Sequence, residues 1–177
     1  MSDADFPNVW DVASYGGGLV AVVPRGLHHS TAWYSADGDQ WLKAEVPEDF
    51  HVTYVSSTTN GLFAWFDHRV FTSADGQHWF DVAKAPDPTG GRLCFVQDIG
   101  GQTVLGATSG STPLAWVLEG SRWTSRPSLA AGENSDGWCG RHQTAMTSAL
   151  GPPGKVSIRP LEDFFDTVFL EAEEGSP

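Results

Sequence analysis

Short β-rich runs recur along the chain in pairs, and a glycine turn separates the two members of each pair. The first members cover residues 9–15, 52–57, 93–99 and 144–150, and the second members begin at Gly18, Gly61, Gly101 and Gly154. Runs of this length bounded by glycine are typical of β-strands joined in hairpins. No long amphipathic helix is predicted. The best helix candidate is 161–170, with a strand over 166–172 as the alternative.

A sequence repeat, Ser-Ala-Asp-Gly-x-x-Trp, follows the second run of the first two pairs. Its residues are Ser35, Asp37, Gly38 and Trp41 in the first copy and Ser73, Asp75, Gly76 and Trp79 in the second. A degraded third copy keeps Gly120 and Trp123 but has Glu119 in place of the aspartate. Asp-Gly between β-rich runs indicates a hairpin turn, and the serine and aspartate side chains can accept backbone N–H groups within it.

A proline follows each of these tryptophans and marks the exit from a sheet, because proline cannot continue a central strand. Each unit therefore contains four antiparallel strands in about 40 to 45 residues, the size of one propeller blade. The predicted fold is an all-β propeller of about four blades, with the last one irregular. The repeat domain covers 1–160, and 161–177 forms a last strand or short helix with an acidic tail. The expected blades cover about 8–47, 50–87, 91–127 and 143–172.

The Ser-x-Asp-Gly-x-x-Trp motif resembles the Asp-box, or BNR, repeat of sialidase-like β-propellers. Here Asp37-Gly38 and Asp75-Gly76 are adjacent, whereas the fuller family pattern has one residue between the aspartate and the glycine. The resemblance implies a fold and a structural role for the box. It does not imply an activity, because such repeats occur in hydrolases, lectin-like binders and scaffolds alike.

Three and a half blades fit in the chain, and a closed propeller needs at least four. We favour a compact four-bladed ring in which the acidic N-terminal arm adds the missing outer strand. The alternative is an open array whose edges pair with another copy or with a partner, because an uncovered edge promotes aggregation.

In a meander, the first and third turns of every blade lie on one rim. The opposite rim carries the second-to-third loops and the blade-to-blade connections, and in sialidase-like propellers it is the ligand face. The residues that we expect to bind a ligand there are His28, His29, His68, Arg69, Trp138, Arg141 and His142. The last three lie in a long loop, 125–142, which is either functional or a linker between blades.

The composition narrows the choice of partners. The chain has 22 Asp and Glu against 10 Lys and Arg, which gives a net charge of −12. Nucleic acid is excluded as an expected partner, since phosphate backbones require clustered basic residues. No apolar run is long enough to insert into a membrane. Cys94 and Cys139 are interpreted as two buried thiols, with a single disulfide as the alternative. No metal and no cofactor are predicted, because tandem histidines point to different sides of an extended segment.

These features favour a non-enzymatic protein that binds or scaffolds, with protein partners in an assembly, including copies of itself, or a surface glycan. The N-terminus lacks a signal peptide, so we expect a bacteriophage tail or other virion component, or an extracellular protein, with a cytoplasmic location as the alternative. A sialidase-like glycan hydrolase is the second hypothesis, although its Phe/Tyr-Arg-Ile-Pro motif is absent. An accessory domain of a bacterial enzyme is the third. No catalytic residue is assigned.

Overall fold

The computed structural model describes residues 9–26, 28–82, 85–143, 148–149 and 158–159. They form three four-stranded antiparallel sheets in which neighbouring strands follow one another along the chain. The strands of the first sheet are β1 (Asp11–Tyr15), β2 (Gly18–Pro24), β3 (Ser30–Ser35) and β4 (Leu42–Lys43). Those of the second are β5 (Tyr54–Thr58), β6 (Gly61–Phe66), β7 (Arg69–Ser73) and β8 (Phe80–Asp81). Those of the third are β9 (Arg92–Ile99), β10 (Gln102–Ser109), β11 (Thr112–Glu119) and β12 (Arg122–Ser125). The predicted all-β class and antiparallel meanders are confirmed.

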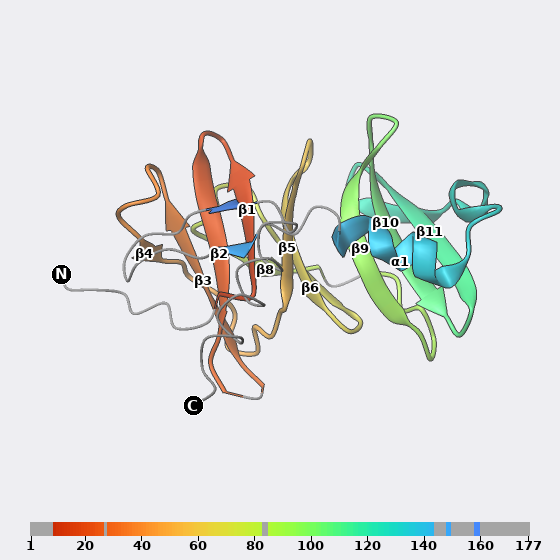
Figure 1. The fold of residues 1–177 in the computed structure, drawn as a ribbon, viewed down its shortest axis with the longest axis horizontal. Coiled ribbons are helices and arrows are strands. Elements are labelled where there is room, and N and C mark those ends of the chain that lie inside the picture. Colours follow the sequence, from red (N-terminus) through yellow and green to blue (C-terminus); the bar gives the residue numbers. More distant parts are fainter. Residues whose placement is uncertain (1–8, 27, 83–84, 144–147, 150–157, 160–177) are drawn as a thin grey trace, which may run out of the picture.

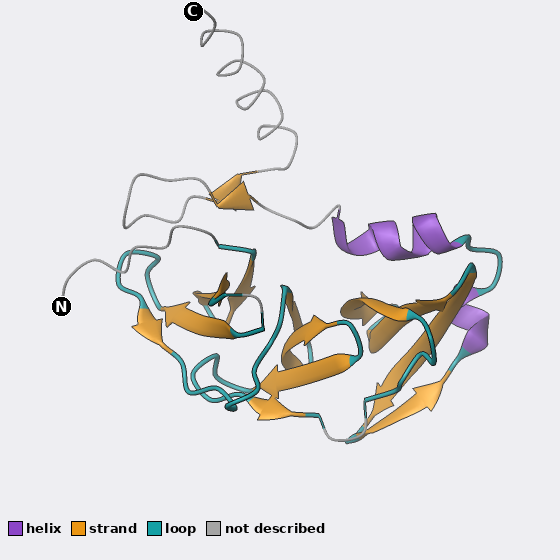
Figure 2. Cartoon of the chain, turned by 90° about the horizontal axis from the view of Figure 1, so that it is seen from below, coloured by secondary structure: helices purple, strands orange, loops and turns teal. Residues whose placement is uncertain are grey.

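The three sheets follow one another along the long axis of the molecule (Figure 1), and from a second direction they trace an arc (Figure 2). The first strands of successive sheets are neighbours, since β1 packs beside β5 and β5 packs beside β9. Of the predicted fourth blade over 143–172, the structure describes residue 143 and the two-residue strands β13 (Ser148–Ala149) and β14 (Ile158–Arg159), which pair antiparallel. The remainder of that blade, the N-terminal arm and the 161–177 tail lie outside the described residues.

The second sheet is buried on both faces, and strand β6 shows why its sequence is apolar at successive positions. Leu62 and Ala64 belong to the hydrophobic cluster shared with the first sheet. Phe63 and Trp65 point the other way, into the cluster shared with the third sheet. Successive side chains of a strand point to opposite faces of the sheet. A sheet packed between two others therefore needs apolar residues at odd and at even positions of its strands. Removing this much apolar surface from water is the main stabilising contribution to the stack.

A short helix covers the outer face of the third sheet, at the place in the chain where a structureless loop over 125–142 was expected. This expectation is wrong: the segment contains the 3₁₀ helix η1 (Pro127–Ala130) and the α-helix α1 (Ser135–Gln143). Helix α1 packs against β9, β10 and β11 (Figure 2). The Trp138 side chain is fully buried, its ring lies 5.0 Å from the Phe95 ring, and its indole N–H donates to the Leu114 carbonyl over 3.0 Å.

Gly106 makes room for this packing. A Cβ on Gly106 would lie 2.3 Å from the Phe95 ring, so only glycine lets that ring lie flat on the sheet beneath Trp138. The register of β9 shifts at the same place: Phe95 pairs with Gly106 and Leu93 pairs with Ala107, which leaves Cys94 as an extra residue in a β-bulge. The bulge brings Cys94 within bonding reach of α1.

Candidate functional site

The first copy of the Ser-Ala-Asp-Gly-x-x-Trp repeat, called the first box below, closes the β3–β4 hairpin with its own side chains. The Ser35 hydroxyl accepts the backbone N–H of Gly38 over 2.8 Å. One oxygen of Asp37 accepts the N–H groups two and three residues further on, both over 2.9 Å. The Trp41 indole N–H donates to the Gly38 carbonyl over 3.0 Å. These backbone bonds lower the pKa of Asp37, because they favour its ionised form.

The second box repeats this geometry. The Ser73 hydroxyl accepts the N–H of Gly76 over 2.8 Å, and one oxygen of Asp75 accepts the two corresponding N–H groups over 2.8 and 2.9 Å. The Trp79 indole donates to the Gly76 carbonyl over 3.2 Å. Gly38 and Gly76 have φ values of 82° and 75°, which glycine adopts without strain. In both copies the serine and aspartate side chains thus accept backbone N–H groups of their own turn.

The third copy lacks this network. Gly120 forms the turn with φ at 64°, but Glu119 instead accepts a bond from Thr124 over 2.8 Å and pairs with Arg126. The Trp123 indole N–H has no hydrogen-bond acceptor among the described residues, although its ring contacts that of Phe63 at 6.0 Å. Without the Ser-x-Asp pair, Trp123 forms an apolar contact between the second and third sheets.

The second box also joins two sheets. The backbone carbonyl of Glu45, which follows β4, accepts the N–H of Trp79 over 2.9 Å. The backbone N–H of Glu45 donates to the carbonyl of Gln77 over 2.7 Å. The ring of His78 bonds Asp75 over 2.7 Å and lies 3.8 Å from the Glu45 carboxylate. The hydrogen bond that the His78 ring donates to Asp75, with the charges of Asp75 and Glu45, raises the pKa of His78 above its ordinary value.

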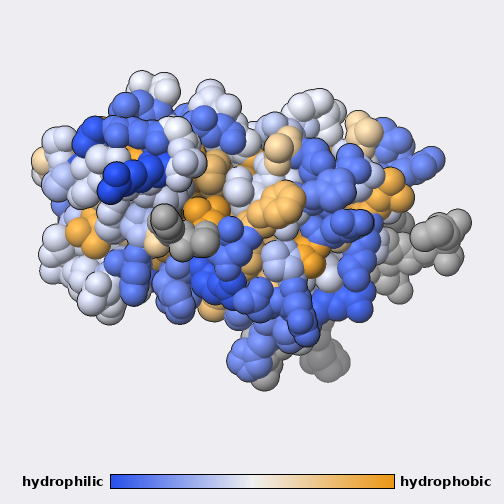
Figure 3. All heavy atoms as spheres, turned by 180° about the vertical axis from the view of Figure 1, so that it is seen from behind, coloured by the Kyte–Doolittle hydropathy of each residue, from blue (hydrophilic) through white to orange (hydrophobic). Residues whose placement is uncertain are grey.

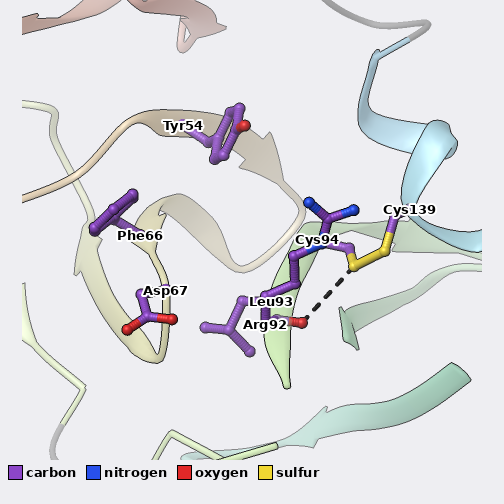
Figure 4. A pocket seen from close by; sticks show the side chains of 7 residues that line it. All are labelled: Tyr54, Phe66, Asp67, Arg92, Leu93, Cys94 and Cys139. Atoms are coloured by element: carbon purple, nitrogen blue, oxygen red, sulfur yellow. Dashed lines mark hydrogen bonds between the residues drawn. A yellow bond between two sulfur atoms is a disulfide. The ribbon is translucent and has the colours of Figure 1, made fainter. Parts of the chain in front are cut away.

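A pocket of about 290 Å³ opens on the rim opposite these boxes, between the second and third sheets (Figure 4). Tyr54 stands at the start of β5, and Phe66 and Asp67 stand where β6 ends. Its other wall comes from the start of β9 and from α1. The full lining is Tyr54, Phe66, Asp67, Arg92, Leu93, Cys94 and Cys139. The lining residues of β5, β6 and β9 gather on one rim because the meander returns each chain segment to the same side, and α1 adds Cys139.

Two contacts fix the walls of the pocket. The Tyr54 ring stacks on the buried Trp65 ring at 5.6 Å, which holds it at the mouth. The carbonyl of Asp67 accepts the Leu93 N–H over 2.9 Å and ties the two sheets together. Asp67 has a positive φ of 54°, an uncommon conformation for a residue other than glycine, in the tight turn that presents its carboxylate.

The disulfide Cys94–Cys139 forms part of this wall. Our interpretation of the two cysteines as buried thiols is therefore wrong, and the alternative of one disulfide is correct. The disulfide could not be predicted from the sequence, because Cys139 lies in a segment without a strand pattern. The bulge that brings Cys94 to the helix also has no clear sequence signal.

The structure separates the predicted binding residues into three groups. The first comprises His28, His29 and His68, which are exposed. A row of rings links His28 to the pocket. The His28 ring lies 6.2 Å from the His51 ring, and the His51 ring lies 4.4 Å from the Phe66 ring, which lines the pocket. Burial, followed by the charges of His28 and His29, lowers the pKa of His51. His68 bonds Asp67 over 2.8 Å.

Arg69 makes the second group and is engaged with the protein itself. Its guanidinium pairs with Asp49 and Asp81 and lies 5.0 Å over the Phe71 ring. The hydrogen bond from Arg69 lowers the pKa of Asp49. These contacts tie β7 to β8 and to the segment between the first two sheets, so Arg69 has a structural role whatever else it contacts.

The third group lies in α1. Trp138 is buried in the core, so the expectation that it binds a ligand at the surface is wrong. Arg141 and His142 belong to α1 by their backbone, and their side chains lie outside the described part of the structure. None of the seven residues that line the pocket, Asp67 and Arg92 included, was among the predicted binding residues. Tyr54 had been recognised only as a strand residue.

No group of three or more His, Cys, Asp or Glu that could hold a metal ion occurs among the described residues. Within the same part of the chain, no helix is long and apolar enough to cross a membrane. No protein-family model matches the sequence, and no curated protein matches it significantly.

Proposed function

We propose that this chain is a non-enzymatic β-propeller of the Asp-box type that binds a surface glycan in the pocket between its second and third sheets. Three consecutive meanders with neighbouring first strands support the propeller form. The matching bond networks of the two boxes support the Asp-box assignment. The observation that carries the proposal is the pocket, because it combines aromatic, cationic and anionic groups on the rim away from the boxes.

This lining suits a sugar. The rings of Tyr54 and Phe66 offer apolar surfaces for the C–H face of a pyranose. The Asp67 carboxylate accepts hydrogen bonds from hydroxyl groups, and the Arg92 guanidinium donates them. A volume of about 290 Å³ lies at the small end of ligand pockets, so it fits one or two sugar rings of a larger chain.

Binding is favoured over hydrolysis by the number of carboxyl groups. Most glycosidases use two carboxyl groups on either side of the scissile bond. Asp67 is the only carboxyl group among the described residues that line the pocket. Turnover of any fluorogenic glycoside or sialoside above the buffer rate would favour the hydrolase hypothesis instead.

Two features support a place in an extracellular assembly such as a virion. A disulfide persists in oxidising surroundings and is rare in the cytosol. In the outermost strands β4 and β8, Leu42 and Phe80 directly follow the box tryptophans. These two residues are 52% and 64% exposed to solvent. The face drawn in Figure 3 is mostly hydrophilic, with hydrophobic residues scattered across its middle. Light scattering that detects only monomers of wild type and of Phe80→Ser would argue against self-assembly through this edge.

The test of glycan binding is a glycan microarray probed with wild type, Arg92→Ala and Arg122→Ala. Arg122 is the matched control, because it is exposed and begins β12, directly after the β11–β12 turn on the opposite rim. We expect wild type and Arg122→Ala to select the same glycans and Arg92→Ala to lose at least ten-fold in affinity. An empty array, or equal binding by all three proteins, would contradict the proposal.

A further inference from the structure

We infer that the Cys94–Cys139 disulfide is a redox latch that holds helix α1 against the third sheet and so completes the wall of the pocket. The inference concerns the control of the site, and its consequence for ligand binding rests on the proposed function. The latch itself is a property of α1 and β9, which can be measured without a ligand.

Helix α1 has little stability of its own. It is nine residues long, and its sequence Ser-Asp-Gly-Trp-Cys-Gly-Arg-His-Gln contains two glycines and no alanine or leucine. Isolated helices shorter than about 12 residues are marginal in water, and each internal glycine weakens them further. The sequence also lacks an apolar stripe at helical spacing. Helix α1 therefore depends on a few anchors to the sheet.

The anchors that the structure shows are adjacent in the sequence. Trp138 inserts its ring beside Phe95, and Cys139 is bonded to Cys94 at the bulge of β9. At the N-terminal end, Asn134 caps the helix, because its side chain accepts the Gly137 N–H over 2.7 Å. Breaking the disulfide removes the covalent attachment of α1 to β9, so the helix then depends on the packing of Trp138 and on its other contacts with the sheet.

The disulfide faces the pocket, because both of its cysteines line it (Figure 4). A dithiol such as dithiothreitol reaches the sulfur atoms through this opening. Its thiolate attacks one sulfur, the Cys94–Cys139 bond breaks, and a mixed disulfide forms. The second thiol of the reductant then displaces the protein sulfur and closes the oxidised ring. Two electrons and two protons pass from the dithiol to the protein, which is left with two thiols.

Reduction therefore opens the pocket on the side formed by Cys139, while Tyr54, Phe66 and Asp67 remain fixed by the second sheet. Binding and redox state are coupled in both directions, since a coupling free energy between two sites is reciprocal. A sugar held in the pocket shields the disulfide from thiolate attack, and the intact disulfide preserves the wall that the sugar contacts.

Hydrogen–deuterium exchange on the full chain tests the latch, with and without dithiothreitol. We expect amides of residues 135–140 to exchange at least ten-fold faster in the reduced protein, and amides at Gly38 and Gly76 in the two boxes to exchange at an unchanged rate. Gly140→Ala strengthens the helix without a clash, since its Cβ would meet no atom within 4 Å. We therefore expect this variant to reduce the effect of dithiothreitol several-fold.

Two results would overturn the inference. Exchange over 135–140 that is unchanged by reduction would mean that the disulfide is not needed to hold the helix. Loss of protection at the boxes as well would mean that the disulfide supports the whole fold and is not a local latch. Neither result depends on a glycan. If the array selects a glycan, the reduced protein should bind it at least ten-fold more weakly. If the array is empty, the proposed function fails and the exchange result stands by itself.

Discussion

The two oxygens of the Asp75 carboxylate bind both ends of His78. Oδ1 accepts its backbone N–H over 2.9 Å, and Oδ2 bonds its ring Nδ1 over 2.7 Å. Asp37 makes the same backbone bond to Gln40 but has no imidazole beside it. The second box therefore contains a charge-dependent contact that the first box lacks, and this contact faces Glu45 of the first sheet.

This difference predicts a pH dependence that His78→Gln removes. Bonding to Asp75 raises the pKa of His78 above its ordinary value of 6.5, so folding favours the protonated ring. The resulting stability is complete below about pH 6.5 and is lost as the pH rises through the raised pKa. Urea unfolding of wild type and His78→Gln between pH 5.5 and 8.5 measures it. Glutamine is the residue that the first box carries at this position.

His51 titrates in the opposite sense, because burial and the neighbouring histidines lower its pKa. The stability that the neutral His51 ring contributes to the fold is present above about pH 6.5 and is lost as the pH falls through the lowered pKa. The His78 contribution is therefore the difference between the wild-type and His78→Gln curves, and it should shrink with rising pH. A constant difference across the range would show that the ring bond carries no charge-dependent stability.

Ser73→Ala tests the brace of the second box. The Ser73 side chain is almost fully buried and accepts the N–H groups of Asp75 and Gly76. Without its oxygen the Gly76 N–H is left buried and unsatisfied, so we expect a loss of about 1–3 kcal/mol in the free energy of unfolding. Ser57→Ala, on the exposed side of β5, is the control and should change stability by less than about 0.5 kcal/mol. Equal effects would contradict a structural role for the box serine.

Gly106→Ala should destabilise the third sheet. The added methyl group would lie 2.3 Å from the Phe95 ring, which is itself held between the sheet and Trp138. Overpacking of this kind typically costs about 1–3 kcal/mol, and thermal unfolding measures it. Gly140→Ala has the opposite expected sign, because it adds helix propensity where space is free. Destabilisation by both variants to the same degree would contradict the packing described for Phe95.

Trp138→Ala tests whether α1 is part of the core. The substitution removes a fully buried ring, and we expect a loss of about 3–5 kcal/mol on chemical unfolding. Trp138→Phe is the matched control: it keeps an aromatic contact to Phe95 and removes the indole N–H that donates to the Leu114 carbonyl. We expect it to retain most of the stability. A small effect of Trp138→Ala would show that the helix is dispensable to the fold.

The repeats made the sheets predictable from sequence. Gly18, Gly61 and the Asp-Gly turns mark the hairpins, so the strand pairing and the two boxes could be assigned without a structure. The outer face of the third sheet could not, because Trp138 lies among glycines and polar residues and gives no periodic signal. Trp138 is buried because it packs on Phe95, and Phe95 in turn lies against Gly106. These residues are far apart in the sequence, so no local sequence pattern indicates the packing.

The rim could be predicted, but the pocket could not. Alternating strand direction places the turn at Asp67 and the start of β9 on the side away from the boxes. The residues that line the pocket come from the ends of separate elements, and Tyr54 and Leu93 resemble ordinary strand residues in the sequence. His28, His29 and His68 do not line the pocket, and the His28 ring is linked to it through the rings of His51 and Phe66.

The central claim is that one rim of the molecule is structural and the opposite rim binds a glycan. The most direct measurement is an NMR titration of the ¹⁵N-labelled chain with a glycan selected on the array. We expect the backbone signals of Tyr54, Phe66, Asp67 and Arg92 to shift in a saturable manner, while those of Gly38 and Gly76 stay in place. Saturable shifts centred on the box turns, with the pocket signals unchanged, would contradict the account.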